Sequence, residues 1–221
     1  EWGAIKAAQA LQCKWSEWAG LPPMEQVYQD VKKSAIKETV TPKKVGDAPA
    51  VIQAVAKTLK ASYEYPVQTH GSIGPSCSVA DVRKDHAVIW SASQSPHWLQ
   101  GQIAKMLGFQ REQVRIIYVE GAGCYGRNGH EDASADAALL SQAMGKPVRV
   151  QWMRADENGW DPKSPPYVAD MEGALDGSGH VHAWNFVTWL PARIGGMADV
   201  PLLADSLEHR ELRRWVTKLK P

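Results

Sequence analysis

Apolar side chains recur every three or four positions along the first part of the chain. Trp2 and Trp15 lie near the ends of the first such run, and Gly20 with the two prolines after it breaks the pattern. This period predicts amphipathic helices, and Asp47 is of the type that caps a helix N-terminus. We therefore expect a helical N-terminal segment over residues 1–60. Its expected helices cover residues 1–18, 24–33 and 47–59.

The pattern changes at Ala61, where short runs typical of strands begin. Strands are expected at residues 62–67, 78–83, 87–92, 113–120, 147–153, 167–175 and 180–190. Helices are expected at residues 96–107 and 132–144, because Gly108 and Gly145 follow them as typical helix ends. Tight turns are expected at residues 84–86 and 176–179, and a loop at residues 154–166.

Strands and helices alternate between residues 88 and 153, which predicts an α/β (mixed α+β) fold, a mixed sheet with helices packed on it. The outer strands look antiparallel. The 221 residues suffice for one large domain or two small ones. We assign residues 61–190 to one domain after the helical segment, and residues 191–221 to a C-terminal tail. The basic end of this tail is a candidate helix.

The composition is that of an ordinary globular protein, with 44% hydrophobic residues, 22% charged residues and a net charge of +1. A core can form, and the charge gives no electrostatic case for binding nucleic acid or membranes. The spacing of Cys13, Cys77 and Cys124 matches no zinc site. Because the chain starts at Glu1 without a methionine, we interpret it as a piece of a longer polypeptide.

A glycine motif follows the strand expected at residues 113–120. Residues Gly121 to Gly126 fit G-x-G-x-x-G, which on the pattern alone indicates an NAD-binding Rossmann-type oxidoreductase. In that fold the helix starts inside the motif. Here a helix over residues 124–129 would carry two glycines, Gly126 and Gly129, each of which costs up to about 1 kcal/mol, and the apolar helical period starts only near Ala133. We therefore disfavour the dinucleotide alternative.

A glycine loop after a strand can still serve a ligand. Its N–H groups can approach a flat or anionic group closely, and Arg127 could add a planar cation for phosphate. A structural loop with a surface arginine is the alternative.

The surrounding residues resemble a known family, the xanthine dehydrogenase and aldehyde oxidase large subunits. The likeness is strongest to the isoquinoline 1-oxidoreductase and nicotinate dehydrogenase type, over residues 61–184. It is carried by seven stretches in the same order and spacing: residues 89–96, 107–108, 113–115, 123–127, 137–140, 145–148 and 152–157.

The resemblance implies a molybdopterin cofactor, with the cytosine dinucleotide form as one candidate. Gln94 falls where the family's glutamine hydrogen-bonds an oxo ligand of molybdenum. The family's glycine-glycine-phenylalanine-glycine loop lies beside the cofactor, and its place is taken here by Gly123, Cys124, Tyr125 and Gly126, with Arg127 next. Cys124 replaces a glycine, and Tyr125 replaces the aromatic residue that helps to place a flat substrate.

The resemblance also implies the reaction, hydroxylation of an aldehyde or an N-heterocycle with oxygen from water. The family's glutamate base would lie beyond this chain, so we expect the chain alone to be inactive. A small [2Fe–2S] subunit, a downstream electron acceptor and a small-molecule substrate are the implied partners. The bacterial cytoplasm and a periplasmic or membrane-associated location both fit the family. The alternative that is not an enzyme is a non-catalytic interaction domain.

Other residues have less specific interpretations. His130, Glu131 and Asp132 could suggest a metal site, but carboxylates at a helix start more often favour its positive end. Glu131 is also a shifted candidate for a substrate-side glutamate that some family members carry. Cys124 as a nucleophile is weaker than Cys124 as a packing residue, and His70 is more often structural than part of a pocket.

Overall fold

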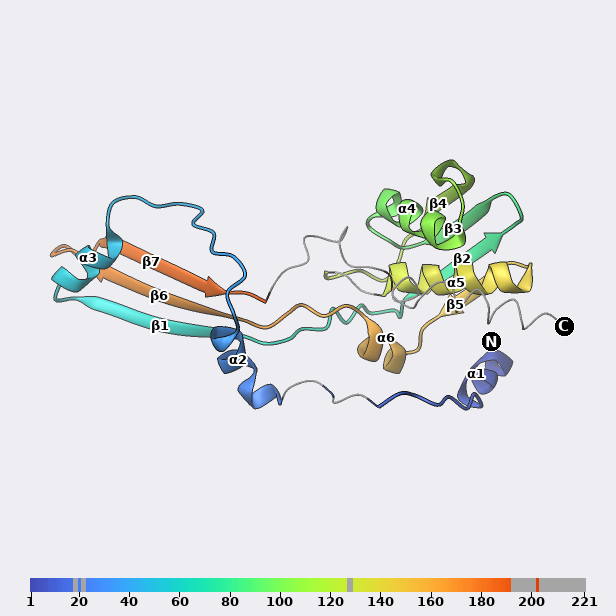
Figure 1. Ribbon diagram of the computed structural model, residues 1–221, viewed down its shortest axis with the longest axis horizontal. Helices are drawn as coiled ribbons and strands as arrows, with labels where there is room; N and C mark the ends of the chain where they lie inside the picture. Colours follow the sequence, from blue (N-terminus) through green and yellow to red (C-terminus); the bar gives the residue numbers. More distant parts are fainter. Residues whose placement is uncertain (18–19, 21–22, 127–128, 192–201, 203–221) are drawn as a thin grey trace.

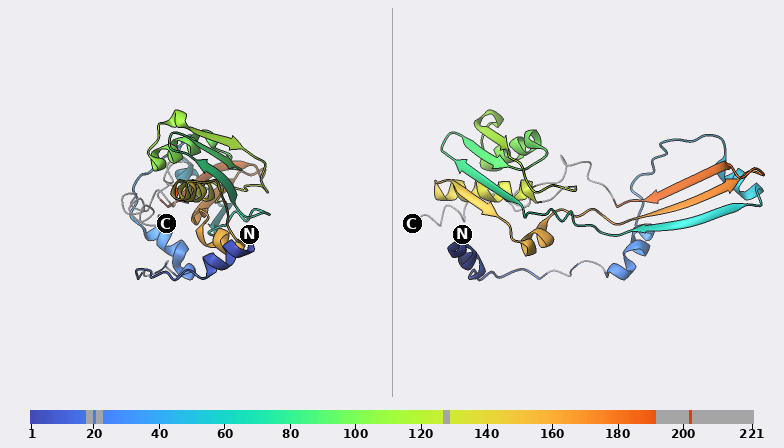
Figure 2. Two further views of the ribbon diagram at one scale, coloured as in Figure 1. Left: turned by 90° about the vertical axis from the view of Figure 1, so that its right-hand side faces the viewer. Right: turned by 180° about the vertical axis from the view of Figure 1, so that it is seen from behind.

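The computed structural model describes residues 1–17, 20, 23–126, 129–191 and 202. Two sheets lie at opposite ends of an elongated molecule (Figure 1), and the view from behind shows the same arrangement (Figure 2). Two chain segments run side by side between the sheets. They are joined by a bridge between Gln68 and Ser164, in which the two backbone N···O distances are 3.2 and 3.0 Å. The tail expected at residues 191–221 lies outside the described residues, except for Pro191 and Leu202.

The first sheet has three antiparallel strands in the order β1-β6-β7. Its strands are β1 (Thr58–Tyr65), β6 (Tyr167–Leu175) and β7 (Val181–Trp189). Helix α3 (Ala48–Ala54) packs on one face, where its Ile52 meets Ala174 and Ala183. Asp47 caps this helix as predicted, because its carboxylate accepts from the N–H of Ala50 at 3.2 Å.

The second sheet has four strands in the order β4-β3-β2-β5. Only the β3–β4 pair is parallel. The strands are β2 (Cys77–Val82), β3 (Ala87–Ser91), β4 (Val114–Tyr118) and β5 (Val148–Gln151). Helices α4 (Pro96–Leu107) and α5 (His130–Met144) pack on this sheet and on each other, and the main apolar core lies between them and the strands. The predicted mixed α/β fold is confirmed.

Several local predictions are confirmed in detail. Helix α4 has the predicted bounds, because Pro96 suits a helix start and Gly108 ends the helix with a left-handed φ of 76°. Gly145 ends α5 in the same way, with φ 63°. The β2–β3 hairpin closes as predicted, with the Arg83 N–H donating to the His86 carbonyl at 2.8 Å.

Other predictions are wrong at element ends. Helix α1 (Trp2–Gln9) stops well before Trp15, whose side chain is 80% exposed and has no surface to pack against. The short helical stretch expected at residues 24–33 is confirmed, as a 3-10 turn (Met24–Gln26) followed by α2 (Val27–Lys33). Another 3-10 turn (Arg111–Gln113) precedes β4.

Two further corrections concern a strand and a helix. Leu59 belongs to β1 and not to the end of α3, since pairing with Gly173 of β6 overrides the helical period. Residues 154–166 were expected to be a loop, but α6 (Arg154–Trp160) forms there. Among the described residues, none of the helices has the length and apolar character that a membrane-spanning helix needs.

Candidate functional site

The parallel pairing of β3 and β4 brings two connections to one edge of the four-stranded sheet. Ser91 is paired with Tyr118 at the ends of these strands. The Val119 N–H donates to the Ser91 carbonyl at 3.0 Å. A Cβ added at Gly121 would lie 2.6 Å from that of Ala92. The turn that carries Gln94 and the glycine loop are therefore neighbours.

The glycine loop has an unusual backbone. Gly123 and Gly126 have φ values of 90° and 131°, and Tyr125 between them has φ 55°. Tyr125 is the one non-glycine residue in the described part of the chain with positive φ, which favours glycine and is strained for a bulky side chain. Its side chain is 65% exposed, whereas Cys124 is buried with its thiol against the Gly126 carbonyl. Cys124 thus packs inside the loop.

The segment before β2 supports the glycine loop from the side. His70 Nδ1 lies 3.0 Å from the Tyr125 carbonyl oxygen. A carbonyl only accepts, so Nδ1 carries the proton. The imidazole lies where a Cβ of Gly126 would be, so only glycine fits there. The Ile73 N–H donates to the Ala122 carbonyl at 3.3 Å.

Helix α6 anchors this supporting segment in turn. Glu157 is fully buried, and its carboxylate accepts from Ser76 N–H at 2.8 Å and from Ser76 Oγ at 2.9 Å. Asp161 accepts from Thr69 Oγ1 at 3.0 Å and pairs with Lys163. Burial lowers the pKa of Lys163, although the Glu157 charge opposes this shift. Helix α6 was not predicted from the sequence, where its signal is the pair of acidic residues in its first turn.

The far end of the glycine loop rests on a tryptophan. Trp152 occupies the space where a Cβ of Gly129 would lie, and its indole N–H donates to Asp136 Oδ2 at 3.0 Å. Burial raises the pKa of Asp136, and the bond from Trp152 works in the opposite direction. The close contacts at Gly121, Gly126 and Gly129 together fix the loop between β4 and α5.

The other sequence candidates lie behind the glycine loop and not on its exposed side. His130, Glu131 and Asp132 are buried at the start of α5, and no cluster of His, Cys, Asp or Glu suited to a metal occurs among the described residues. Arg127 lies outside the described residues.

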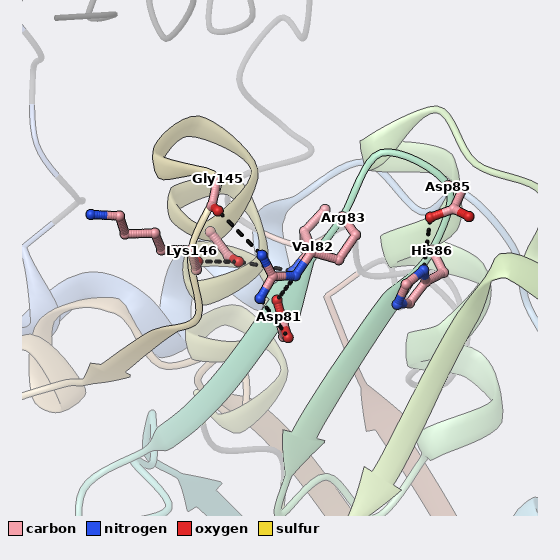
Figure 3. Close-up of polar contacts among 8 residues, drawn as sticks. Asp81, Val82, Arg83, Asp85, His86, Gly145 and Lys146 are labelled. Carbon is pink, nitrogen blue, oxygen red and sulfur yellow. Dashed lines mark hydrogen bonds and ion pairs between the residues drawn. The ribbon is translucent and has the colours of Figure 1, made fainter.

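A hollow of about 290 Å³ lies at the opposite edge of the sheet, beside the β2–β3 hairpin. Arg83 crosses it, with its guanidinium 2.6 Å from Asp81 and 3.4 Å from the Gly145 carbonyl (Figure 3). The hollow is lined by Val82, Arg83, Lys84, Phe109, Gln142 and Gly145. The Asp81 carboxylate neutralises the charge of Arg83. The glycine loop lies at the other end of the strands, so this hollow is separate from the candidate site.

The residues at the loop edge fit a flat, polar cofactor. Gln94, Gly123, Tyr125 and Gly126 are all exposed on this edge. Positive φ and missing side chains let backbone N–H groups approach a ligand closely. The model of the molybdopterin cofactor-binding domain matches residues 28–196. This chain belongs to the molybdopterin cofactor-binding domain family.

Relatives of known name support the assignment. A nicotinate dehydrogenase subunit of Pseudomonas putida is 39% identical over 191 residues, which cover 86% of this chain and 16% of that protein. The aldehyde oxidoreductase molybdenum-binding subunit PaoC of Escherichia coli K12 is 27% identical over 179 residues, or 80% of this chain and 24% of that protein. The chain therefore spans a quarter or less of these relatives.

Solved structures share the fold. Quinoline 2-oxidoreductase from Pseudomonas putida 86 superposes with a TM-score of 0.64 at 18% identity, over 84% of this chain and 25% of that one. The matched family model and the nicotinate dehydrogenase relative confirm the resemblance to the molybdenum hydroxylase large subunits. The Rossmann alternative is wrong, because α5 starts at His130, beyond the glycine motif.

Proposed function

We propose that this chain forms one wall of the molybdopterin site of a hydroxylase large subunit. The observation that carries the proposal is the meeting of the Gln94 turn and the glycine loop at one exposed sheet edge, where Ala92 touches Gly121. The proposed cofactor-binding residues are Gln94, Gly123, Cys124, Tyr125, Gly126 and Arg127. Residues 61–190 would contribute this wall as one domain.

Each residue type has a physical role in this proposal. The Gln94 carboxamide is a neutral donor that would hydrogen-bond the cofactor without adding charge. Gly123 and Gly126 would let the backbone lie against it, and Cys124 packs beneath them. The exposed Tyr125 ring offers a flat face to a planar substrate, while its backbone is held by His70. When bound, the cofactor would supply two-electron oxidation with oxygen taken from water.

The names of the relatives support a proposal for the substrate class. By their names, two of them act on an N-heterocycle, namely nicotinate dehydrogenase and quinoline 2-oxidoreductase, and the aldehyde oxidoreductase acts on an aldehyde. We propose one of these classes for the intact subunit. A [2Fe–2S] subunit and a downstream electron acceptor would take the electrons, and the cytosine dinucleotide form is the proposed cofactor variant. The base that this reaction needs is not among the residues assigned here.

The test is Gln94→Glu in the intact subunit with its natural partners. Glutamate keeps the size of glutamine but brings a negative charge and no donor. We expect turnover to fall by about a hundredfold or more, with an unchanged circular dichroism spectrum. The control is Gln53→Glu, which should leave turnover unchanged. Gln53 is an exposed residue of α3, the helix that packs on the three-stranded sheet. Equal turnover in both variants would remove Gln94 from the site.

A further inference from the structure

A buried polar cluster lies directly beneath the Gln94 turn. Ser91, Ser93, Glu131 and Ser134 are exposed by 2% or less. Buried polar groups are stable when each has a hydrogen-bond partner, and these four residues are linked to one another by hydrogen bonds. They come from two elements, the end of β3 with its turn and the first turns of α5.

Ser93 is the centre of the cluster. Its Oγ donates to Glu131 Oε1 at 2.7 Å and accepts from the backbone N–H of Ser95 at 3.0 Å. Its own backbone N–H donates to Ser91 Oγ at 3.1 Å. The residues before and after Gln94 are therefore both tied to serine hydroxyls, so the backbone that carries Gln94 is fixed on each side.

Helix α5 holds the other half of the cluster. Ser134 Oγ lies 2.8 Å from Ser91 Oγ and 2.7 Å from the His130 carbonyl oxygen. Glu131 lies in the first turn of α5, where a carboxylate also interacts well with the helix dipole. Helix α5 directly follows the glycine loop. The cluster therefore connects the two parts of the proposed cofactor wall, the Gln94 turn and the glycine loop, on their buried side.

We infer that Glu131 is a positioning residue, which fixes the Gln94 turn through Ser93. At 2% exposure its carboxylate faces the protein interior and not the open edge, so it does not take the place of the substrate-side glutamate. A hydrogen bond to a carboxylate is stronger than one between neutral groups, which makes Ser93–Glu131 the strongest link of the cluster. The effect on turnover rests on the proposed function, whereas the effect on the turn does not.

Two substitutions in the intact, cofactor-loaded subunit test this inference. Glu131→Ala leaves the Ser93 hydroxyl without its acceptor, while Glu131→Gln retains a carbonyl oxygen of the same reach. We expect kcat of the alanine variant to fall roughly tenfold to a hundredfold, with KM changed by less than about threefold. The glutamine variant should stay within about threefold of the wild type. Amide hydrogen exchange in the peptide of residues 91–99 should accelerate about tenfold in the alanine variant alone.

Ser141→Ala is the matched control. This buried serine bonds Val82 N–H at 2.9 Å and the Lys146 carbonyl at 2.7 Å at the other end of α5, so its loss should destabilise α5 without changing exchange in the 91–99 peptide or kcat. Should Glu131→Ala not fold, Ser93→Ala removes the same bond by a smaller change, with the same expected results.

The outcomes separate the two proposals. If amide exchange and turnover of Glu131→Ala equal those of the Ser141→Ala control, the positioning role is overturned. Faster exchange with an unchanged kcat would also overturn it, because the Gln94 turn would then have moved without an effect on the reaction. Faster exchange in a subunit that binds no molybdenum would support the link from Glu131 to the turn and would overturn the proposed function instead.

Discussion

The contact between Gly126 and His70 offers a sharp test of how the glycine loop is held. Gly126→Ala places a methyl group on a backbone with φ 131°, within the space of the imidazole ring. The ring would have to move, although its Nδ1 holds the Tyr125 carbonyl at 3.0 Å. We expect the substitution to destabilise the loop and the fold around it.

The magnitude follows from two contributions. An L-residue in a sparsely populated backbone region costs about 1–3 kcal/mol. Displacing His70 loses a hydrogen bond worth about 0.5–1.5 kcal/mol net. The expected loss in the free energy of unfolding is therefore about 1.5–4.5 kcal/mol.

Urea denaturation followed by tryptophan fluorescence measures this loss. Gly177→Ala is the control, because a Cβ there meets nothing within 4 Å, and we expect it to change stability by less than about 0.5 kcal/mol. His70→Ala in the Gly126→Ala background should lower stability little further, because the His70 hydrogen bond is already lost there and the backbone strain remains. If Gly126→Ala were as stable as Gly177→Ala, the described packing of His70 on the loop would be refuted.

Two further predictions concern buried carboxylates. Glu157→Ala should lower the free energy of unfolding by about 3 kcal/mol in urea denaturation, because both donors of Ser76 lose their acceptor; a loss below about 1 kcal/mol would contradict the anchoring role of α6. Burial raises the pKa of Asp136 above its usual value of 3.8, so the folded state binds this proton more tightly than the unfolded state, and stability decreases as pH rises through the raised pKa. Asp136→Asn, which keeps an acceptor for Trp152, should therefore gain stability relative to the wild type between about pH 4 and about pH 7, and a difference that does not change with pH would contradict the raised pKa.

Local signals in the sequence predicted much of the four-stranded sheet and its helices. The bounds of α4 are set by Pro96 and Gly108, which act through their own backbone preferences. The hairpin after β2 is likewise local. Helix α6 escaped prediction because its stability depends on Glu157 reaching Ser76, which is 81 residues away, and no pattern in a short window shows such a contact.

The candidate site was predictable in part. The family resemblance named Gln94 and the glycine loop, and their roles stay predictions. The support by His70 was invisible in the sequence, since the hydrogen bond to Tyr125 spans 55 residues. The burial of Glu131 was also hidden, because a carboxylate at a helix start is usually solvated. Long-range polar contacts of this kind appear only when the chain is folded.

The most direct test of the central claim is the cofactor content of the natural subunit, purified intact with its partners. Metal analysis and pterin analysis of the same sample would be compared with its nucleotide content. We expect about one molybdenum and one pterin per subunit, and no stoichiometric NAD. Tightly bound NAD in a subunit without molybdenum would contradict the account.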